Sequence, residues 1–326
     1  MENLPNEILL IIMNLCNTLT KINLSNVNKY FYENTQIHDL INVPKINLMN
    51  LNDEILKQKK FKNLKQLWIG PNITQKGISE LDLIELNVSL NEKIRNITFM
   101  KNLKILVATG NCGIDQNKVK LLNLIELHVP NNKKIKDVSH MKKLKILDAS
   151  GYCGIDQRGI EGLDLVELYI SDNEHINDIS HMKNLKILDA SGYCRINQAV
   201  IEELNLIKLK ASNNVKIKNV CFMQSLKILN AGFNCGIDQN GIQGLDLMEL
   251  NAKFNTKINN VTFMKNLKKL VIDGNCGVDQ NGINGLDLTL LSAVNNRKIY
   301  DVAFMKNLKI LNARGNWQNR FYQKRF

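Results

Sequence analysis

Residues 144–164 read LKILDASGYCGIDQRGIEGLD, and residues 165–184 continue as LVELYISDNEHINDISHMKN before the first pattern starts again. The leucine that opens the longer segment recurs every 41 residues from Leu103 onward, and a second leucine series beginning at Leu83 lies between. Repeats of 20 and 21 residues therefore alternate, and we call them short and long repeats. Such a period predicts stacked repeats that share one core, here a solenoid over residues 42–326.

Every repeat carries the pattern L-x-x-L-x-L-x-x-N-x-x-I, which we number from its first leucine. Positions 2 to 6 alternate as a short strand does, so positions 4 and 6 point inward. One repeat cannot bury its own leucines, and stacked neighbours form one parallel sheet. The asparagine at position 9 follows the strand, where its amide is expected to satisfy backbone groups as an asparagine ladder. Tyr152 and Tyr193 replace it in two repeats.

The pattern resembles the leucine-rich-repeat family, with about thirteen copies and a degenerate first copy at Val43, Ile46 and Leu48. Long repeats, as at Cys153 to Leu163, are similar to the cysteine-containing repeats of many F-box proteins. Short repeats, as at Asn173 to Leu185, are similar to internalin-type or phosphatase-regulator-type repeats. The resemblance implies an α/β solenoid with a parallel concave sheet. Repeats this short leave room only for 3₁₀ turns, extended pieces and one-turn helices opposite the sheet.

Five cysteines recur at the same 41-residue step, at Cys112, Cys153, Cys194, Cys235 and Cys276. Neighbouring strands lie about 4.8 Å apart, so cysteines two repeats apart are separated by roughly 10 Å. A disulfide needs Cα atoms within about 7 Å, which predicts free thiols that pack as small core residues. We expect no metal site, because no C-x-x-C motif or histidine cluster is present.

Other features exclude whole classes of function. No Ser-His-Asp, P-loop or H-E-x-x-H pattern appears, so we expect neither an enzyme nor a cofactor. The apolar run from Ile8 to Met13 is too short to span a bilayer and lacks the features of a signal peptide. Cysteines without a secretion signal favour the cytoplasm or nucleus. The net charge of +12 gathers in Met-Lys-Asn-Leu-Lys segments, which suit a solvated rim or an acidic partner rather than specific nucleic-acid binding.

Residues 1–41 do not fit the repeat and predict three helices. Pro5 and Glu7 suit a helix start, and Ile8 and Ile12 share one helical face. Thr20 is expected to cap a second helix, and a third is expected from about residue 26 to residue 37.

This segment resembles the F-box, whose pattern is L-P-x-E-[IL]-L-x-x-I followed by V-[CN]-[KR]-x-[FW]. Leu4-Pro5-Asn6-Glu7-Ile8-Leu9 matches the first part and Val27-Asn28-Lys29-Tyr30-Phe31 the second. The linker before Val27 is about one residue longer than usual, and Thr20-Lys21 replaces the usual Asp-Leu. In that family the module docks on the Skp-type adaptor of cullin-RING ubiquitin ligases. The resemblance assigns the adaptor contacts to Leu4, Pro5, Ile8, Leu9, Ile12, Ile22, Val27 and Phe31.

The resemblance thus implies a non-catalytic subunit that recruits a target protein to a ubiquitin ligase. Two alternatives remain: a binding scaffold whose N-terminus only caps the solenoid, and a decoy that occupies the adaptor without delivering a target. The Asn, Lys and Ile content resembles that of proteins from large DNA viruses of amoebae, in which case a host ligase would be redirected.

Repeat proteins of this kind usually bind through the concave sheet, where position 5 faces solvent. The candidate target contacts are Trp68, His128, Asp148, Tyr169, Asp189 and Lys210. They combine aromatic, acidic and basic groups, as protein–protein interfaces do. Trp68 is the best candidate for a single anchor residue of such an interface. A solvated polar sheet face would give a similar pattern.

Overall fold

The computed structural model describes residues 51–315, together with residues 5, 8, 9, 11, 12, 16–27, 29–38 and 40. The chain forms two compact units: an N-terminal unit of residues 1–147 with 153–160, and a C-terminal unit of residues 148–152 with 161–326. Leu4 and the degenerate repeat at residues 43–48 lie outside the described residues.

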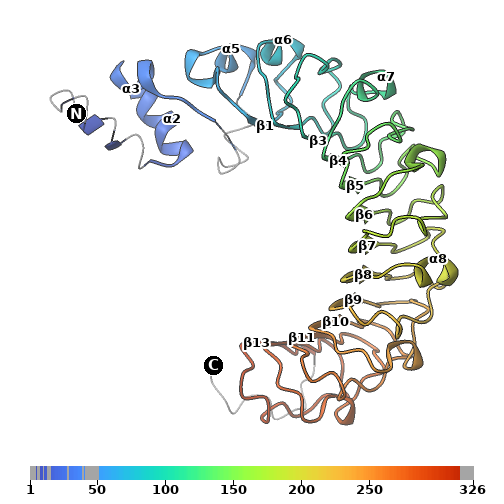
Figure 1. Cartoon of the computed structure of the whole chain (residues 1–326). Helices are drawn as coiled ribbons and strands as arrows, with labels where there is room; N and C mark the ends of the chain where they lie inside the picture. The colour runs from blue at the N-terminus through green and yellow to red at the C-terminus, as the bar shows by residue number, and fades with distance from the viewer. Residues whose placement is uncertain are drawn as a thin grey trace. The chain divides into compact units, whose positions relative to one another are not determined.

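Three-residue strands follow one another in chain order, one to each repeat (Figure 1). They are β1 Gln66–Trp68, β2 Glu85–Asn87, β3 Ile105–Val107, β4 Glu126–His128, β5 Ile146–Asp148, β6 Glu167–Tyr169, β7 Ile187–Asp189, β8 Lys208–Lys210, β9 Ile228–Asn230, β10 Glu249–Asn251, β11 Lys269–Val271, β12 Leu290–Ser292 and β13 Ile310–Asn312. Within each unit, neighbouring strands pair in parallel with equivalent positions opposed, as Leu86 is to Leu106 and Leu168 to Leu188. The predicted solenoid and its parallel sheet are confirmed.

The core is a column of aliphatic side chains. Position 4 residues such as Leu127 and Leu209 have no exposed surface, and neither do Val129 and Ala211 at position 6. Stacking supplies this burial, because each leucine is covered by its equivalents in the neighbouring repeats.

Three residues after each strand from β2 onward, position 8 adopts the left-handed conformation. From the second described repeat onward this position has φ between 57° and 83°, as at Asn131 and Gly315. Glycine and asparagine favour that conformation, and several repeats place one of them there. Leu90, Phe233 and Phe254 do not belong to either type and still have φ of 57–60°.

Short helices and 3₁₀ turns lie opposite the strands, as predicted. They are α6 Gln75–Ile78, η2 Arg158–Ile160, α7 Gln116–Val119, α8 Gln198–Glu202, η3 Asn240–Ile242 and η4 Asn281–Ile283. Gln116 ties neighbouring repeats together there: its Oε1 accepts from the amides of Lys136 and Asp137 at 2.7 and 2.9 Å, and its Nε2 donates to the Asp137 carbonyl.

The asparagine ladder occupies only the short repeats, which corrects the expectation of one asparagine in every repeat. Asn132 and Asn214 in short repeats are buried, whereas Asn111 and Asn234 at the same position of long repeats are exposed. In long repeats the buried group is instead the position 10 cysteine, including Cys194. A thiol serves there because it is small and donates to the position 6 carbonyl, as the Cys194 Sγ does to Ala190 at 3.1 Å.

The N-terminal helices have other bounds than predicted: the second is longer and the third is shorter. After helical residues at Ile8, Leu9, Ile11 and Ile12 come α2 Thr18–Val27 and α3 Lys29–Asn34, followed by α5 Asp53–Leu56 and η1 Lys59–Phe61. The cap of α2 is Asn17, whose Oδ1 accepts from the Thr20 amide at 2.9 Å, and not Thr20 itself. The third helix ends at Asn34 rather than near Ile37. Within the described ranges, no helix is both long and apolar enough to cross a membrane.

Candidate functional site

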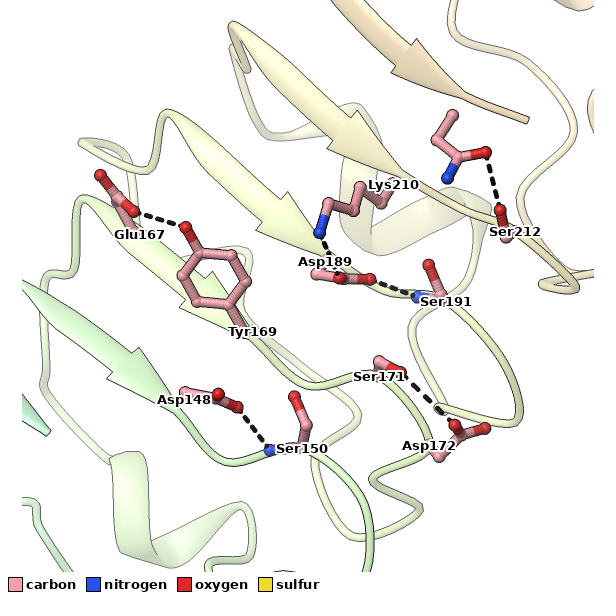
Figure 2. Close-up of polar contacts among 11 residues, drawn as sticks. Asp148, Ser150, Glu167, Tyr169, Ser171, Asp172, Asp189, Ser191, Lys210 and Ser212 are labelled. Carbon is pink, nitrogen blue, oxygen red and sulfur yellow. Dashed lines mark hydrogen bonds and ion pairs between the residues drawn. The ribbon is translucent and has the colours of Figure 1, made fainter. Parts of the chain in front are cut away.

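Four of the predicted target contacts form one row in the C-terminal unit (Figure 2). Asp148, Tyr169, Asp189 and Lys210 occupy position 5 of the consecutive strands β5 to β8. The Lys210 ammonium lies 3.1 Å from the Asp189 Oδ2 and 5.8 Å from the centre of the Tyr169 ring. The row therefore combines an aromatic ring, two carboxylates and a cation on one face of the sheet.

Tyr169 is held by a residue that the sequence pattern did not mark as part of the site. Its hydroxyl donates to the Glu167 Oε2 at 2.6 Å. Burial and this hydrogen bond raise the pKa of Tyr169, so the phenol stays neutral. The Glu126 Oε1 lies 2.6 Å from the Nε2 of His128 in the same way. In these two repeats the position 3 glutamate thus holds the position 5 side chain of its own strand.

The two aspartates of the row also bind their own backbone. Asp148 Oδ1 accepts from the Ser150 amide at 3.1 Å, and Asp189 Oδ1 accepts from the Ser191 amide at 3.2 Å. Each bond fixes the carboxylate at the end of its strand. These residues are therefore held rigidly, as a preformed recognition surface requires.

Trp68 and His128 do not belong to this row. Both lie in the N-terminal unit, Trp68 on β1 and His128 on β4, with β2 and β3 between them. Trp68 is 41% exposed, and its Nε1 donates to the Glu85 Oε1 at 3.4 Å. It remains a single exposed ring on that strand.

The predicted adaptor contacts divide into surface and core. Pro5 and Ile8 are exposed, and Ile11, which the F-box pattern did not single out, is 54% exposed. Leu9 and Phe31 form the buried core of the helices, so they hold the helices together rather than offer a contact surface.

The remaining predicted contacts are neither clearly surface nor clearly core. Ile12 and Ile22 are half-buried, and Ile12 packs on the core of the helices. Val27 ends α2. Leu4 lies outside the described residues.

All seven cysteines are thiols, and the five at position 10 of the long repeats are buried, whereas Cys16 and Cys221 are half-buried. Over the described part of the chain, no three histidine, cysteine, aspartate or glutamate side chains are grouped so that they could hold a metal ion.

The sequence matches no family model and no curated protein. Among solved structures, the chain is similar to one in the yeast Rad7 and Elc1 complex, at 19% identity and a TM-score of 0.54, covering 92% of this chain and 91% of that one. It also matches the functional domain of InlJ from Listeria monocytogenes, which includes a cysteine ladder, at 19% identity and a TM-score of 0.46, over 78% and 64% of the two chains. A leucine-rich-repeat protein of Leptospira interrogans matches at 17% identity and a TM-score of 0.41, over 91% and 86%.

The likeness to the chain in the Rad7 and Elc1 complex extends over nearly the whole length of both proteins, and at this identity it speaks for the fold alone. It agrees with the parallel strands, the 20/21-residue period and the position 4 leucines. This chain therefore has the fold of a leucine-rich-repeat protein.

Proposed function

We propose that this chain is a substrate-recruiting subunit of a cullin-RING ubiquitin ligase. Its N-terminal helices would bind a Skp-type adaptor, and its repeats would bind a target protein. The observation that carries the proposal is the exposed apolar surface of Pro5, Ile8 and Ile11 above a core of Leu9 and Phe31.

The exposure of Ile8 and Ile11 supports a partner for these helices. The two isoleucines are three residues apart on a helical segment and therefore lie on neighbouring positions of its surface. They are 43% and 54% exposed. A helical segment that only caps a core has no need to present such residues to solvent, whereas a docking surface uses them. The Rad7 chain, which is similar in fold, was itself solved in complex with a second protein, Elc1.

The repeats would supply the target site through the row of Asp148, Tyr169, Asp189 and Lys210. Catalysis would then consist of proximity, since a bound target presents its lysines to the ubiquitin-conjugating enzyme at a high effective concentration. No residue of this chain has to take part in the chemistry.

A second candidate function, a binding scaffold without a role in ubiquitin transfer, is favoured by the way the helices join the solenoid. The Lys60 ammonium, in η1, donates to the Ser25 Oγ at 2.9 Å and the Asn26 Oδ1 at 3.1 Å, both in α2. The Ile37 amide donates to the Lys60 carbonyl at 2.7 Å. These contacts are what a cap requires, because the first coil of a solenoid must be covered.

Binding to a purified, immobilised Skp-type adaptor separates the two functions. We expect the wild type to be retained and the double variant Pro5→Ala, Ile8→Asp to be lost. Ile207→Asp is the matched control, because Ile207 lies in the solenoid and is 45% exposed, close to the 43% of Ile8. If the wild type does not bind the adaptor, the ubiquitin-ligase proposal is wrong and the binding-scaffold function is the one that remains. If the wild type binds, the level of a co-purified protein is followed with and without inhibition of the cullin. A recruiter lowers that level only while the cullin is active, whereas a decoy leaves it unchanged.

A further inference from the structure

A row of exposed aromatic residues follows the strands of the C-terminal unit. Tyr193, Phe233 and Phe254 lie three or four residues after the ends of β7, β9 and β10, at positions 8 and 9 of their repeats, and we call them the aromatic rim. They are 80%, 43% and 44% exposed. The rim is separate from the position 5 row, because its residues lie beyond the ends of the strands.

The backbone at Phe233 and Phe254 is unfavourable for phenylalanine. Both residues have φ of 57°, in the left-handed region, where a side chain with a Cβ is strained. Other repeats relieve this position with glycine, asparagine or aspartate, as at Gly192, Asn213 and Asp172. Phenylalanine here costs stability and leaves two rings in solvent. Strain of this kind at an exposed position is a mark of a functional site.

The neighbours of the two rings accommodate them. The ring centres lie 5.4 Å apart with an angle of 32° between the planes. A Cβ on Gly274 would come within 2.0 Å of Phe254 Cε1, so the glycine leaves room for the ring. The Lys253 ammonium lies 5.5 Å from the centre of the Phe254 ring. The pair therefore forms one continuous apolar platform with a cation beside it.

Lysines bring further positive charge to the rim by reaching back one repeat. The Lys216 Nζ donates to the Cys194 carbonyl at 3.3 Å, directly after Tyr193. The Lys257 Nζ donates to the Cys235 carbonyl at 3.1 Å, two residues after Phe233. Each ammonium is thus fixed at the backbone of a residue one or two places after an exposed aromatic residue. These lysines are exposed, so their charge remains open to a partner.

Negative charge is scarce around Phe233 and Phe254, whereas beside Tyr193 the Asp172 Oδ1 accepts from the Tyr193 amide at 3.0 Å. Positions 7 to 11 of the repeats from β7 to β12 contain six basic residues and one carboxylate, that of Asp273. Asp273 is only 9% exposed, accepts from the Ser292 Oγ at 2.6 Å and lies 3.8 Å from the Lys253 Nζ. The edge is therefore basic as well as aromatic.

We propose that the aromatic rim docks an acidic segment of a partner protein, with apolar side chains seated on Phe233 and Phe254 and carboxylates facing Lys216, Lys253 and Lys257. The lysines favour a segment with acidic side chains because the charges are complementary. The two phenylalanine rings favour an apolar side chain of that segment as the anchor. A single-stranded nucleic acid could also stack bases on exposed rings beside lysines, so the test below includes it as an outcome that overturns the proposal. The proposal rests on the protein-binding role of the repeats and not on the adaptor.

The test uses the full chain and phage-displayed random peptides. Enriched peptides are expected to be acidic and to contain aromatic or aliphatic residues. Their affinity should fall about tenfold or more for the variant Phe233→Asn, Phe254→Asn and should fall steeply with salt. Since asparagine is what other repeats use at this position, the variant keeps the fold, and an unchanged or raised Tm confirms that. Leu90→Asn makes the same change in the N-terminal unit and should not alter binding.

A charge variant, Lys216→Gln with Lys257→Gln, should weaken the same peptides while leaving Tm within a few degrees. The proposal is overturned if no peptide is enriched, if the enriched peptides bind the asparagine variant as well as the wild type, or if they carry no net negative charge. It is also overturned if an oligothymidylate binds the wild type and loses affinity for the asparagine variant while the peptides do not. Because no adaptor is present, these outcomes are independent of whether the N-terminal helices bind one.

Discussion

The side-chain amide of Asn214 lies 3.4 Å from the sulfur of Cys194, one repeat earlier in the chain. The same Nδ2 donates to the carbonyls of Ala190 at 2.9 Å and Ile196 at 3.2 Å, and its Oδ1 accepts from the Lys216 amide at 2.9 Å. One buried amide thus satisfies three backbone groups in two repeats. Buried asparagine in short repeats thus alternates with buried cysteine in long repeats, at the 41-residue period.

Replacement of Asn214 by alanine should destabilise the protein by about 3 kcal/mol, because several buried backbone groups lose their partners at once. Asn234→Ala is the matched control, since Asn234 stands at the same position of the next long repeat and is exposed. It should change stability by less than about 0.5 kcal/mol. Urea unfolding measures both, and equal losses would contradict the alternating ladder.

The ladder thiols should resist modification in the native protein. Burial raises the pKa of Cys194 and of Cys235 to about 11, from an ordinary value of 9.0, so both remain protonated at neutral pH. A disulfide reagent at about pH 8 should react with the half-buried Cys16 and Cys221 and reach the ladder only after denaturation. Rapid native reaction of Cys194 would show that the solenoid opens.

The same burial predicts a loss of stability in alkali. A thiol whose pKa is higher in the folded chain contributes fully to the stability at pH values below its ordinary pKa of 9.0. It loses this contribution as the pH rises toward its pKa of about 11 in the folded chain. Thermal unfolding should therefore move to lower temperature across that range. The variant Cys194→Ala should show a shallower decline than the wild type, and parallel curves would count against the assignment.

Acid should weaken the protein through aspartates that pair with asparagines of the following repeat. The amide of Asn266 donates to the Asp246 Oδ1 at 3.0 Å, its Nδ2 donates to the Oδ2, and these bonds lower the pKa of Asp246. Because the pKa of Asp246 is lower in the folded chain, the ionised carboxylate stabilises the fold at pH values above its ordinary pKa of 3.8. That stability is lost as the pH falls through the pKa of the folded chain. Tm should drop below about pH 4, less steeply in Asp246→Asn.

Leu90 offers a test of the left-handed position that involves no binding. Its φ is 60°, and it is 73% exposed. Leu90→Asn should stabilise the protein by about 1 kcal/mol, because the strain is relieved and little burial is lost. Leu121 is 66% exposed but not left-handed, so Leu121→Asn should bring no gain. A gain from both substitutions would mean that removing an exposed leucine, and not relief of the backbone strain, raises the stability.

Much of the fold could be predicted because the sequence repeats with a fixed period. The position 4 leucines, the parallel strands and the short turns opposite them all follow from spacing, since stacked copies must place equivalent residues in equivalent surroundings. The position 5 row of Asp148, Tyr169, Asp189 and Lys210 could be named for the same reason. The N-terminal helices have no period, and their predicted boundaries and cap were less accurate, since Asn17 and not Thr20 caps α2.

The sequence by itself determined which residues are equivalent, and therefore the solenoid and its core. Only the tertiary structure decided what each equivalent position does. It buried position 9 in short repeats and exposed it in long ones, turned position 8 left-handed and so left Phe233 and Phe254 strained in solvent, and placed Leu9 and Phe31 inside the helical core. The reason is physical: a pattern fixes spacing along the chain, whereas burial, backbone angle and hydrogen-bond partners depend on the repeats packed on either side.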